Sequence, residues 1–253
     1  MFCVYSFGIA TSLCGAPRND SKGNYINLNT MYEYLLGSLI LLIFWAILYF
    51  RRNDLKKQML WTSIIVMFFA FTGPLYVPEW WKPPTLFDLA NKTGLDIESF
   101  IFTFAIGGIV PTIYYHLFRF KNEKSDTKKR ARFDALIFSI ILFVILLLFS
   151  DMHASHSSAL AMFLGGIMII INRKDLIGKV VFSSVLFATL YFVGFKIFII
   201  TFPSFLESFY SLSNLSGILI WGVPFEELSF SFSVCFLYSG MYEYVKGYKI
   251  KKL

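Results

Sequence analysis

The sequence predicts an all-α membrane protein with seven transmembrane helices, arranged as two parallel three-helix repeats joined by a linker helix. Its 253 residues are 57% hydrophobic and only 15% charged, whereas a soluble domain carries roughly 25% charged residues. The mean hydropathy is +0.63. Several apolar runs reach the length of about 20 residues that crosses a bilayer. This composition excludes an ordinary soluble domain and predicts a multi-pass protein of the cell membrane.

The expected spans cover residues 32–50, 60–77, 97–118, 135–149, 158–171, 180–202 and 223–245. The loops after the first, third, fifth and seventh spans hold 18 of the 23 Lys and Arg residues. Cytoplasmic loops carry such an excess of basic residues, so we expect the N-terminus outside and the C-terminus in the cytoplasm. The net charge of +7 is therefore attributed to membrane orientation, and no nucleic-acid partner is expected.

Two segments of the chain repeat each other. The run Arg52-Asn53-Asp54-Leu55 resembles Arg173-Lys174-Asp175-Leu176, and we call the separation of these runs the first offset. Further matches share a slightly longer separation, the second offset, and they pair Gly94 with Gly222, Glu98 with Glu226, Phe102 with Phe230, Phe104 with Phe232, and Tyr114 with Tyr242. We therefore expect an N-terminal segment at 1–30 that is disordered, a first repeat at 31–119, a basic loop and linker span at 120–157, and a second repeat at 158–253.

The acidic residues at the mouths of two spans are the main functional candidates. Glu226 and Glu227 open the last span, and Glu98 opens the third. Ionisable residues at membrane depth are costly and mark functional sites by default. The spacing i, i+4, i+8 predicts that Gly94, Glu98 and Phe102 share one helical face, as do their counterparts in the second repeat. The alternative is that these acids only cap helix N-termini, where negative charge is favourable.

A buried carboxyl in apolar surroundings can stay protonated near neutral pH. It can then protonate an electron-rich alkene, and a second carboxylate can take a proton back. Aromatic faces can stabilise the carbocation between these steps. Protonation, ring closure and deprotonation together make an isomerisation, for which no cofactor and no metal are expected.

The run Pro224-Phe225-Glu226-Glu227, followed by a Phe-rich helix, resembles the P-x-E-(E/D) motif of the small integral-membrane lycopene cyclases. That family is built of two homologous halves, and the resemblance covers about residues 31–247. It implies cyclisation of the linear ends of lycopene without net redox change. We expect Glu226 to be the general acid, with Glu227 and Glu98 assisting it. Substrate contacts are expected from Pro224, Phe230, Phe102, Trp221 and Asp96. In the first repeat, Asp96 stands where the motif has Pro and Ser99 where it has the second acid.

The expected partners are a carotenoid or other isoprenoid drawn from the bilayer and membrane lipid, with a second copy of the chain or carotenoid-pathway enzymes as further candidates. Two other functions stay open. The paired acids could serve a membrane transport or binding protein, or the chain could be a non-catalytic cyclase subunit. His153 and His156 are interpreted as a solvated outer turn, Lys196 as a snorkelling side chain, and Glu243 as interfacial.

Overall fold

The computed structural model describes residues 32–124, 132–211 and 214–252, so the prediction for residues 1–30 lies outside the described residues. The α-helices are α2 (Glu33–Arg51), α3 (Lys56–Met67), α4 (Leu89–Thr93), α5 (Ile97–Phe118), α6 (Asp134–Phe149), α7 (Ala154–Asn172), α8 (Ile177–Thr201), α9 (Phe205–Phe209), α10 (Phe225–Tyr238) and α11 (Met241–Lys246). Short 3-10 segments are η1 (Asn53–Leu55), η2 (Phe68–Leu75), η3 (Leu86–Asp88) and η4 (Lys174–Leu176). The strands are β1 (Phe120–Lys124), β2 (Leu219–Ile220), β3 (Val223–Pro224) and β4 (Tyr248–Lys252).

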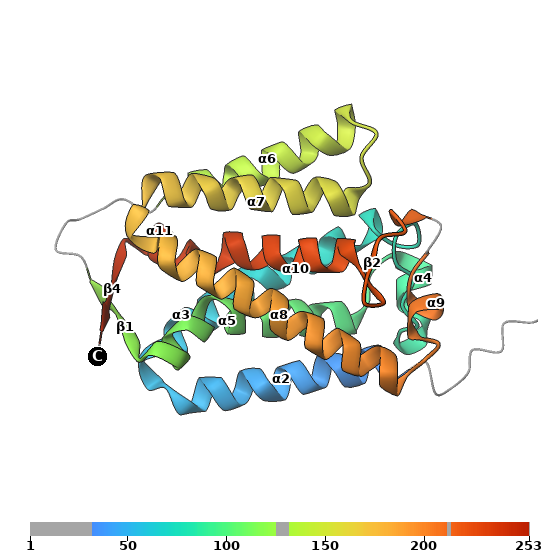
Figure 1. Cartoon of the computed structure of the whole chain (residues 1–253), viewed down its shortest axis with the longest axis horizontal. Helices are drawn as coiled ribbons and strands as arrows, with labels where there is room; N and C mark the ends of the chain where they lie inside the picture. The colour runs from blue at the N-terminus through green and yellow to red at the C-terminus, as the bar shows by residue number, and fades with distance from the viewer. Residues whose placement is uncertain (1–31, 125–131, 212–213, 253) are drawn as a thin grey trace, which may run out of the picture.

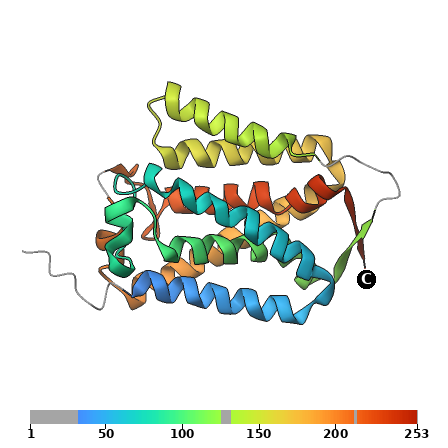
Figure 2. The same cartoon turned by 180° about the vertical axis from the view of Figure 1, so that it is seen from behind.

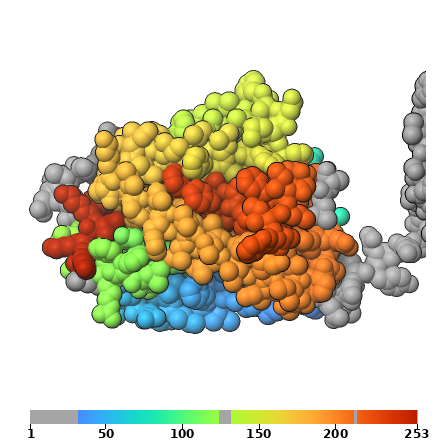
Figure 3. Space-filling model, viewed as in Figure 1, coloured from blue at the N-terminus to red at the C-terminus, as the bar shows by residue number. Residues whose placement is uncertain are grey.

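Five helical segments of the described chain are long and apolar enough to cross a membrane. Large apolar side chains remain exposed along these helices, for example Ile43 on α2 and Val185 on α8. The side chains of α8 lie open across one face of the molecule (Figure 3). Such an apolar exterior suits lipid contact, and the chain is a multi-pass membrane protein. The seven-span count and the orientation stay predictions. The membrane-length segments are Glu33–Arg51, Asn53–Leu75, Ile97–Phe118, Ala154–Asn172 and Lys174–Thr201.

The helices pack as two similar triplets. α5 packs against α2 and α3, and α10 packs in the same way against α7 and α8. α5 also contacts α8 and α10, and these contacts join the triplets (Figures 1 and 2). α6 packs on α7 at the outside of the bundle. The strands β1 and β4 lie at one end of the bundle, and α4, α9 and β2 lie at the other.

The two Arg-x-Asp turns make matched hydrogen bonds. Arg52 binds Asp54 and donates to the backbone carbonyls of Tyr115 and Phe120. Arg173 binds Asp175 and donates to the carbonyls of Glu243 and Tyr248. The two arginines are separated by the first offset, and each pair of accepting carbonyls is separated by the second. These are the separations that the sequence predicts for a duplication.

Strands β1 and β4 pair antiparallel, with Phe120 opposite Lys252, Asn122 opposite Ile250, and Lys124 opposite Tyr248. Asn122 and Ile250 are themselves separated by the second offset, and so are the first residues of the two strands. The pairing therefore maps onto itself when the two repeats are exchanged, as in an isologous contact across a two-fold axis. The two-repeat arrangement stays a prediction, and this register favours it.

Several expected elements differ from the structure. The fold is mostly helical rather than all-α, because β1 pairs with β4 and β2 pairs with β3. The second span changes from α-helix to the 3-10 segment η2, which contains Pro74, a residue that cannot donate a backbone hydrogen bond. The last span is interrupted between Tyr238 and Met241, so that α10 and α11 are separate helices. The helix expected as the fifth span, α7, begins at Ala154, which puts His156 on a helix rather than in a turn.

The prediction that the repeated glycines lie on the same helical faces as the acids is also wrong. Gly94 has a φ of 74° and Gly222 a φ of 86°, and both lie before their acidic helices begin. The left-handed backbone region is readily open to glycine and costly for most other residues. The repeated glycines therefore shape the turns that lead into α5 and α10.

A buried polar network joins the triplets at the β1–β4 end. Lys179 Nζ lies 2.8 Å from Glu243 Oε1, and both side chains are 0% exposed. Tyr115 Oη and Gln58 Nε2 also donate to Glu243 Oε1, at 2.6 and 2.9 Å. Lys179 is the counterpart of Gln58 at the first offset, and Glu243 is the counterpart of Tyr115 at the second. A neutral pair on α3 and α5 thus meets a charged pair on α8 and α11. The side chain of Glu243 is fully buried in the protein, and its level relative to the membrane interface stays a prediction.

Gly107 lets α5 approach α3 closely. A Cβ at this position would lie 2.7 Å from Val66 Cβ and 3.0 Å from Ser63 Cα. We expect Gly107→Ala to lower the free energy of unfolding by about 1–3 kcal/mol, because the backbone of α3 would have to move. Gly194→Ala on α8 is the matched control, since a Cβ there meets no atom within 4 Å. Thermal unfolding in detergent compares the two, and equal midpoints would contradict this account of the α3–α5 contact.

Candidate active site

The acidic pair lies in the first turn of α10, which follows the β2–β3 hairpin. Gly222 turns the chain with its positive φ, and Pro224 occupies the position before the helix. Pro is disfavoured inside a helix and tolerated at its start. Glu226 and Glu227 follow directly, where the positive end of the helix dipole favours negative charge. Both side chains are nevertheless buried, which a cap alone does not require.

One carboxylate oxygen of Glu226 accepts a hydrogen bond, and the other has no partner among the described residues. Its side chain is 2% exposed. Oε1 accepts a hydrogen bond from the backbone amide of Ser216 at 2.6 Å. Among the described residues, Oε2 has no hydrogen-bond partner. His156 Nε2, on the first turn of α7, lies 3.8 Å from Oε1, which is within ion-pair distance. An unpaired buried oxygen is costly in a purely structural role.

Glu98 repeats this arrangement in the first triplet. Its side chain is fully buried, Oε1 accepts from the backbone amide of Leu86 at 2.8 Å, and Oε2 has no partner among the described residues. Asp96 caps α5 through the Ser99 backbone amide at 2.6 Å. Burial raises the pKa of Asp96 above its usual range, and the bonds from Ser99 act in the opposite direction. Each triplet thus places one glutamate under a loop amide at the same end of the bundle.

Glu227 points to a group of aromatic rings. Tyr191 Oη on α8 donates to Glu227 Oε2 at 2.6 Å. Tyr210 lies close enough to interact electrostatically with the same carboxyl. We call the surrounding rings the aromatic cluster, which consists of Tyr34, Trp81, Phe102, Tyr191, Phe195 and Tyr210. The second acid of the motif therefore faces π-systems and phenolic hydroxyls.

The aromatic cluster draws rings from both triplets. Tyr34 on α2 meets Trp81 edge-on, with ring centroids 4.8 Å apart, and lies 6.3 Å from Phe102 on α5. Trp81 lies 6.0 Å from Tyr210. Tyr191 on α8 continues the cluster to Phe195 at 5.9 Å. The cluster therefore occupies the junction between the two triplets at the acidic end.

The first motif reaches the aromatic cluster through a hydroxyl chain. Tyr34 Oη lies 3.0 Å from Ser99 Oγ, and Ser99 Oγ donates to Asp96 Oδ2 at 2.9 Å. Tyr34 is also close enough to interact electrostatically with Asp96, Glu98 and Glu227. The structure thus brings the two acidic motifs to one aromatic site.

The other sequence-predicted site residues fall in different places. Phe102 belongs to the aromatic cluster, and Pro224 is buried at the start of α10. Phe230 lies beside Trp80, with centroids 6.0 Å apart. Trp221 is 80% exposed, packs against Phe192 on α8, and accepts a hydrogen bond from Lys196 at its carbonyl. Trp221 is therefore not brought to the aromatic cluster.

Sequence reasoning missed Tyr191, Tyr210 and His156. Tyr191 lies within an apolar span, where a phenol needs a partner, and that was an available signal. Tyr210 lies in a loop whose position depends on tertiary packing, so the sequence carried no such signal. His156 was assigned to a turn because two histidines near Asp151 look solvated.

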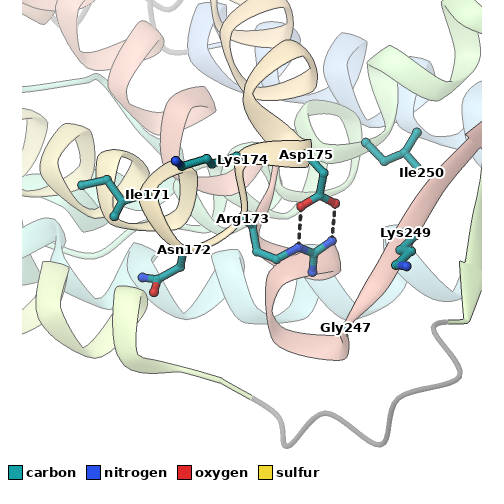
Figure 4. A pocket seen from close by; sticks show the side chains of 8 residues that line it. All are labelled: Ile171, Asn172, Arg173, Lys174, Asp175, Gly247, Lys249 and Ile250. Carbon is teal, nitrogen blue, oxygen red and sulfur yellow. Dashed lines mark hydrogen bonds and ion pairs between the residues drawn. The ribbon is translucent and has the colours of Figure 1, made fainter.

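The described residues contain no group of three or more His, Cys, Asp or Glu side chains that could hold a metal ion. A cavity of about 630 Å³ lies at the opposite end of the bundle, at the junction of α7, η4 and β4 (Figure 4). Arg173 there is held by Asp175, and basic side chains dominate the remaining polar lining. This cavity is separate from the acidic site. Its lining residues are Ile171, Asn172, Arg173, Lys174, Asp175, Gly247, Lys249 and Ile250.

Residues 153–245 match the family model described as lycopene cyclase. This match confirms the expected resemblance for that part of the chain, which holds α7, α8, α10 and most of α11. Glu226, Glu227 and His156 lie inside the matched residues, whereas Glu98 lies outside them. No curated protein and no solved structure matched the chain.

Proposed function

We propose that the chain is a carotenoid cyclase, an intramolecular lyase that closes rings at the ends of a linear polyene taken from the bilayer. The observation that carries this proposal is the burial of the Glu226–Glu227 pair beside the aromatic cluster, within a segment that matches the lycopene cyclase model. An apolar polyene would reach such a site through the membrane, because the exterior of the helices is apolar.

In the proposed reaction, protonated Glu226 transfers its proton to the terminal double bond of the substrate. A tertiary carbocation forms, and a neighbouring double bond attacks it to close the ring. A carbon next to the new cationic centre then loses a proton and becomes part of a double bond. One proton is gained and one is lost, so the product is an isomer of the substrate. The free Oε2 supports Glu226 as the donor, because it can carry the proton without breaking another hydrogen bond.

Glu227 and the aromatic cluster would stabilise the cation. Aromatic faces attract cations through the ring quadrupole, and the attraction strengthens where water is excluded. A carboxylate held by Tyr191 has a fixed position, which suits a group that responds to developing charge. We assign to Glu227 the acceptance of the proton that leaves the product. Phe102 and Tyr34 would supply rings from the first triplet.

The first triplet carries an incomplete motif, because Ser99 stands where the second acid belongs. We propose that residues 31–119 and 158–253 are the two repeats, with 120–157 as their connector, and that the second repeat holds the reactive acids. The matched arginine hydrogen bonds and the symmetric β1–β4 register support this division. Glu98 would position the loop that contains Leu86 and close the aromatic site from its side.

Pigment analysis tests the proposed function. The chain is expressed in cells that accumulate lycopene, and the extract is separated beside that of cells with an empty vector. We expect a cyclic product that only the expressing cells contain. Unchanged lycopene, with the folded protein demonstrated in the membrane, would contradict a self-sufficient cyclase. Activity that appears only with a second cyclase chain would instead assign the role of a partner subunit, and ion flux across vesicles would favour transport.

A further inference from the structure

A partly exposed histidine on α7 lies next to the more deeply buried glutamate of the acidic pair. His156 has a side chain that is 36% exposed, and its Nε2 lies 3.8 Å from Oε1 of Glu226, which is 2% exposed. Its other nitrogen, Nδ1, lies 3.5 Å from Ser155 Oγ. One imidazole therefore connects solvent-accessible surface with a carboxyl that the surface does not reach.

We propose that His156 is the proton-exchange residue of the site, which returns a proton to Glu226 after each ring closure. This inference rests on the proposed cyclase function. After one turnover, Glu226 is a carboxylate and Glu227 carries the proton lost by the product. Glu227 releases that proton to bulk water as the product leaves. The imidazolium of His156 gives its Nε2 proton to Oε1 of Glu226, the oxygen that it faces, and the neutral ring takes a proton from water at its exposed edge. Rotation of the carboxyl then exchanges its two oxygens, so that the unprotonated one accepts the Ser216 amide bond. Imidazole suits this exchange because its charge changes between about pH 5 and 8.

The surroundings of Glu226 leave few other routes for a proton. From the hairpin side it is held by the Ser216 amide, which is not exchanged in turnover. Its helix contributes Glu227, which acts electrostatically on it, and α7 contributes His156. Tyr76 lies against Ser158, two residues along α7 from His156. Among the described titratable groups near Glu226, His156 is the one that combines ion-pair distance with exposure.

The first repeat has no histidine at the position that corresponds to His156. The counterpart of His156 at the first offset is Leu35, an apolar residue. Glu98 shares the loop-amide bond and the free oxygen of Glu226, but no imidazole lies at the matching position of the described chain. The asymmetry agrees with a single proton-exchanging acid, located in the second repeat.

The test is the pH dependence of ring formation in isolated membranes supplied with lycopene. We expect His156→Gln to slow turnover about tenfold or more and to change the pH dependence of ring formation relative to wild type. Imidazole added to His156→Ala should restore turnover. His153→Gln, one turn away and exposed, is the matched control and should keep the wild-type profile.

A His156→Gln protein with the wild-type rate and pH profile would overturn the proposal. So would a His156→Ala protein that is folded, slow at every pH and insensitive to imidazole, because that outcome assigns a packing role. A wild-type chain that forms no cyclic product removes the cyclase function itself. The comparison of wild type with its variants therefore separates the two failures.

Discussion

Glu226→Gln is expected to reduce ring formation by at least about a hundredfold, the usual size of a lost general acid. Glutamine has nearly the same shape, and its carbonyl can still accept the hydrogen bond from the Ser216 amide. It cannot transfer a proton to an alkene, so folding should persist while turnover fails. The measurement is cyclic product per folded protein in membranes supplied with lycopene.

Glu207→Gln is the matched control, since this glutamate is exposed on α9 at the same end of the molecule. Glu98→Gln tests the first repeat, and a smaller loss than in Glu226→Gln is expected because Ser99 and Leu35 leave that motif incomplete. A Glu226→Gln protein that forms product at the wild-type rate would contradict the assignment of Glu226 as proton donor.

Lys179→Met is expected to lower the free energy of unfolding by about 3–5 kcal/mol, because it leaves the Glu243 charge buried without its cation. The double variant Lys179→Met/Glu243→Gln should recover a large part of this loss. The amide carbonyl of the new side chain at position 243 can still accept the hydrogen bonds from Tyr115 and Gln58. Neither member of the former ion pair then carries a charge. Thermal unfolding in detergent measures both.

Lys174→Met makes the same side-chain change at an exposed position of η4, and we expect a shift within about 0.5 kcal/mol. A double variant that is no more stable than Lys179→Met alone would contradict the view that an uncompensated charge causes the loss. A Lys179→Met protein as stable as wild type would show that the buried pair contributes nothing to joining the triplets.

The predictions that rest on composition and local pattern agree with the structure at the level of apolar helices. Long apolar runs predict membrane helices because lipid contact requires apolar side chains. The acids of the motif lie, as predicted, in the first turns of α5 and α10. The predicted topology places Lys179 among the basic loop residues because it follows the fifth span closely, whereas the structure places it buried on α8. Its partner Glu243 lies in the last span, far along the chain, and no sequence spacing indicates that the two meet.

The same reason explains what was missed at the candidate site. Tyr191 meets Glu227 only because α8 crosses α10, and His156 meets Glu226 only because α7 packs against that helix as well. Trp221 is among the residues predicted to contact substrate. The positive φ of Trp221 and Gly222 instead places it on the outside of the hairpin. The acids can therefore be predicted from local sequence spacing, whereas the residues that contact them depend on how the helices pack.

The most direct test of the proposed proton transfer is cyclisation in deuterated water. Membranes that contain the wild-type chain and lycopene are equilibrated in D₂O, and the product is analysed by mass spectrometry. If Glu226 exchanges with solvent through His156, each ring closed should carry one deuterium, because a deuteron is added to the alkene and a substrate proton is lost. A cyclic product without deuterium would contradict proton donation by an exchangeable acid of the protein.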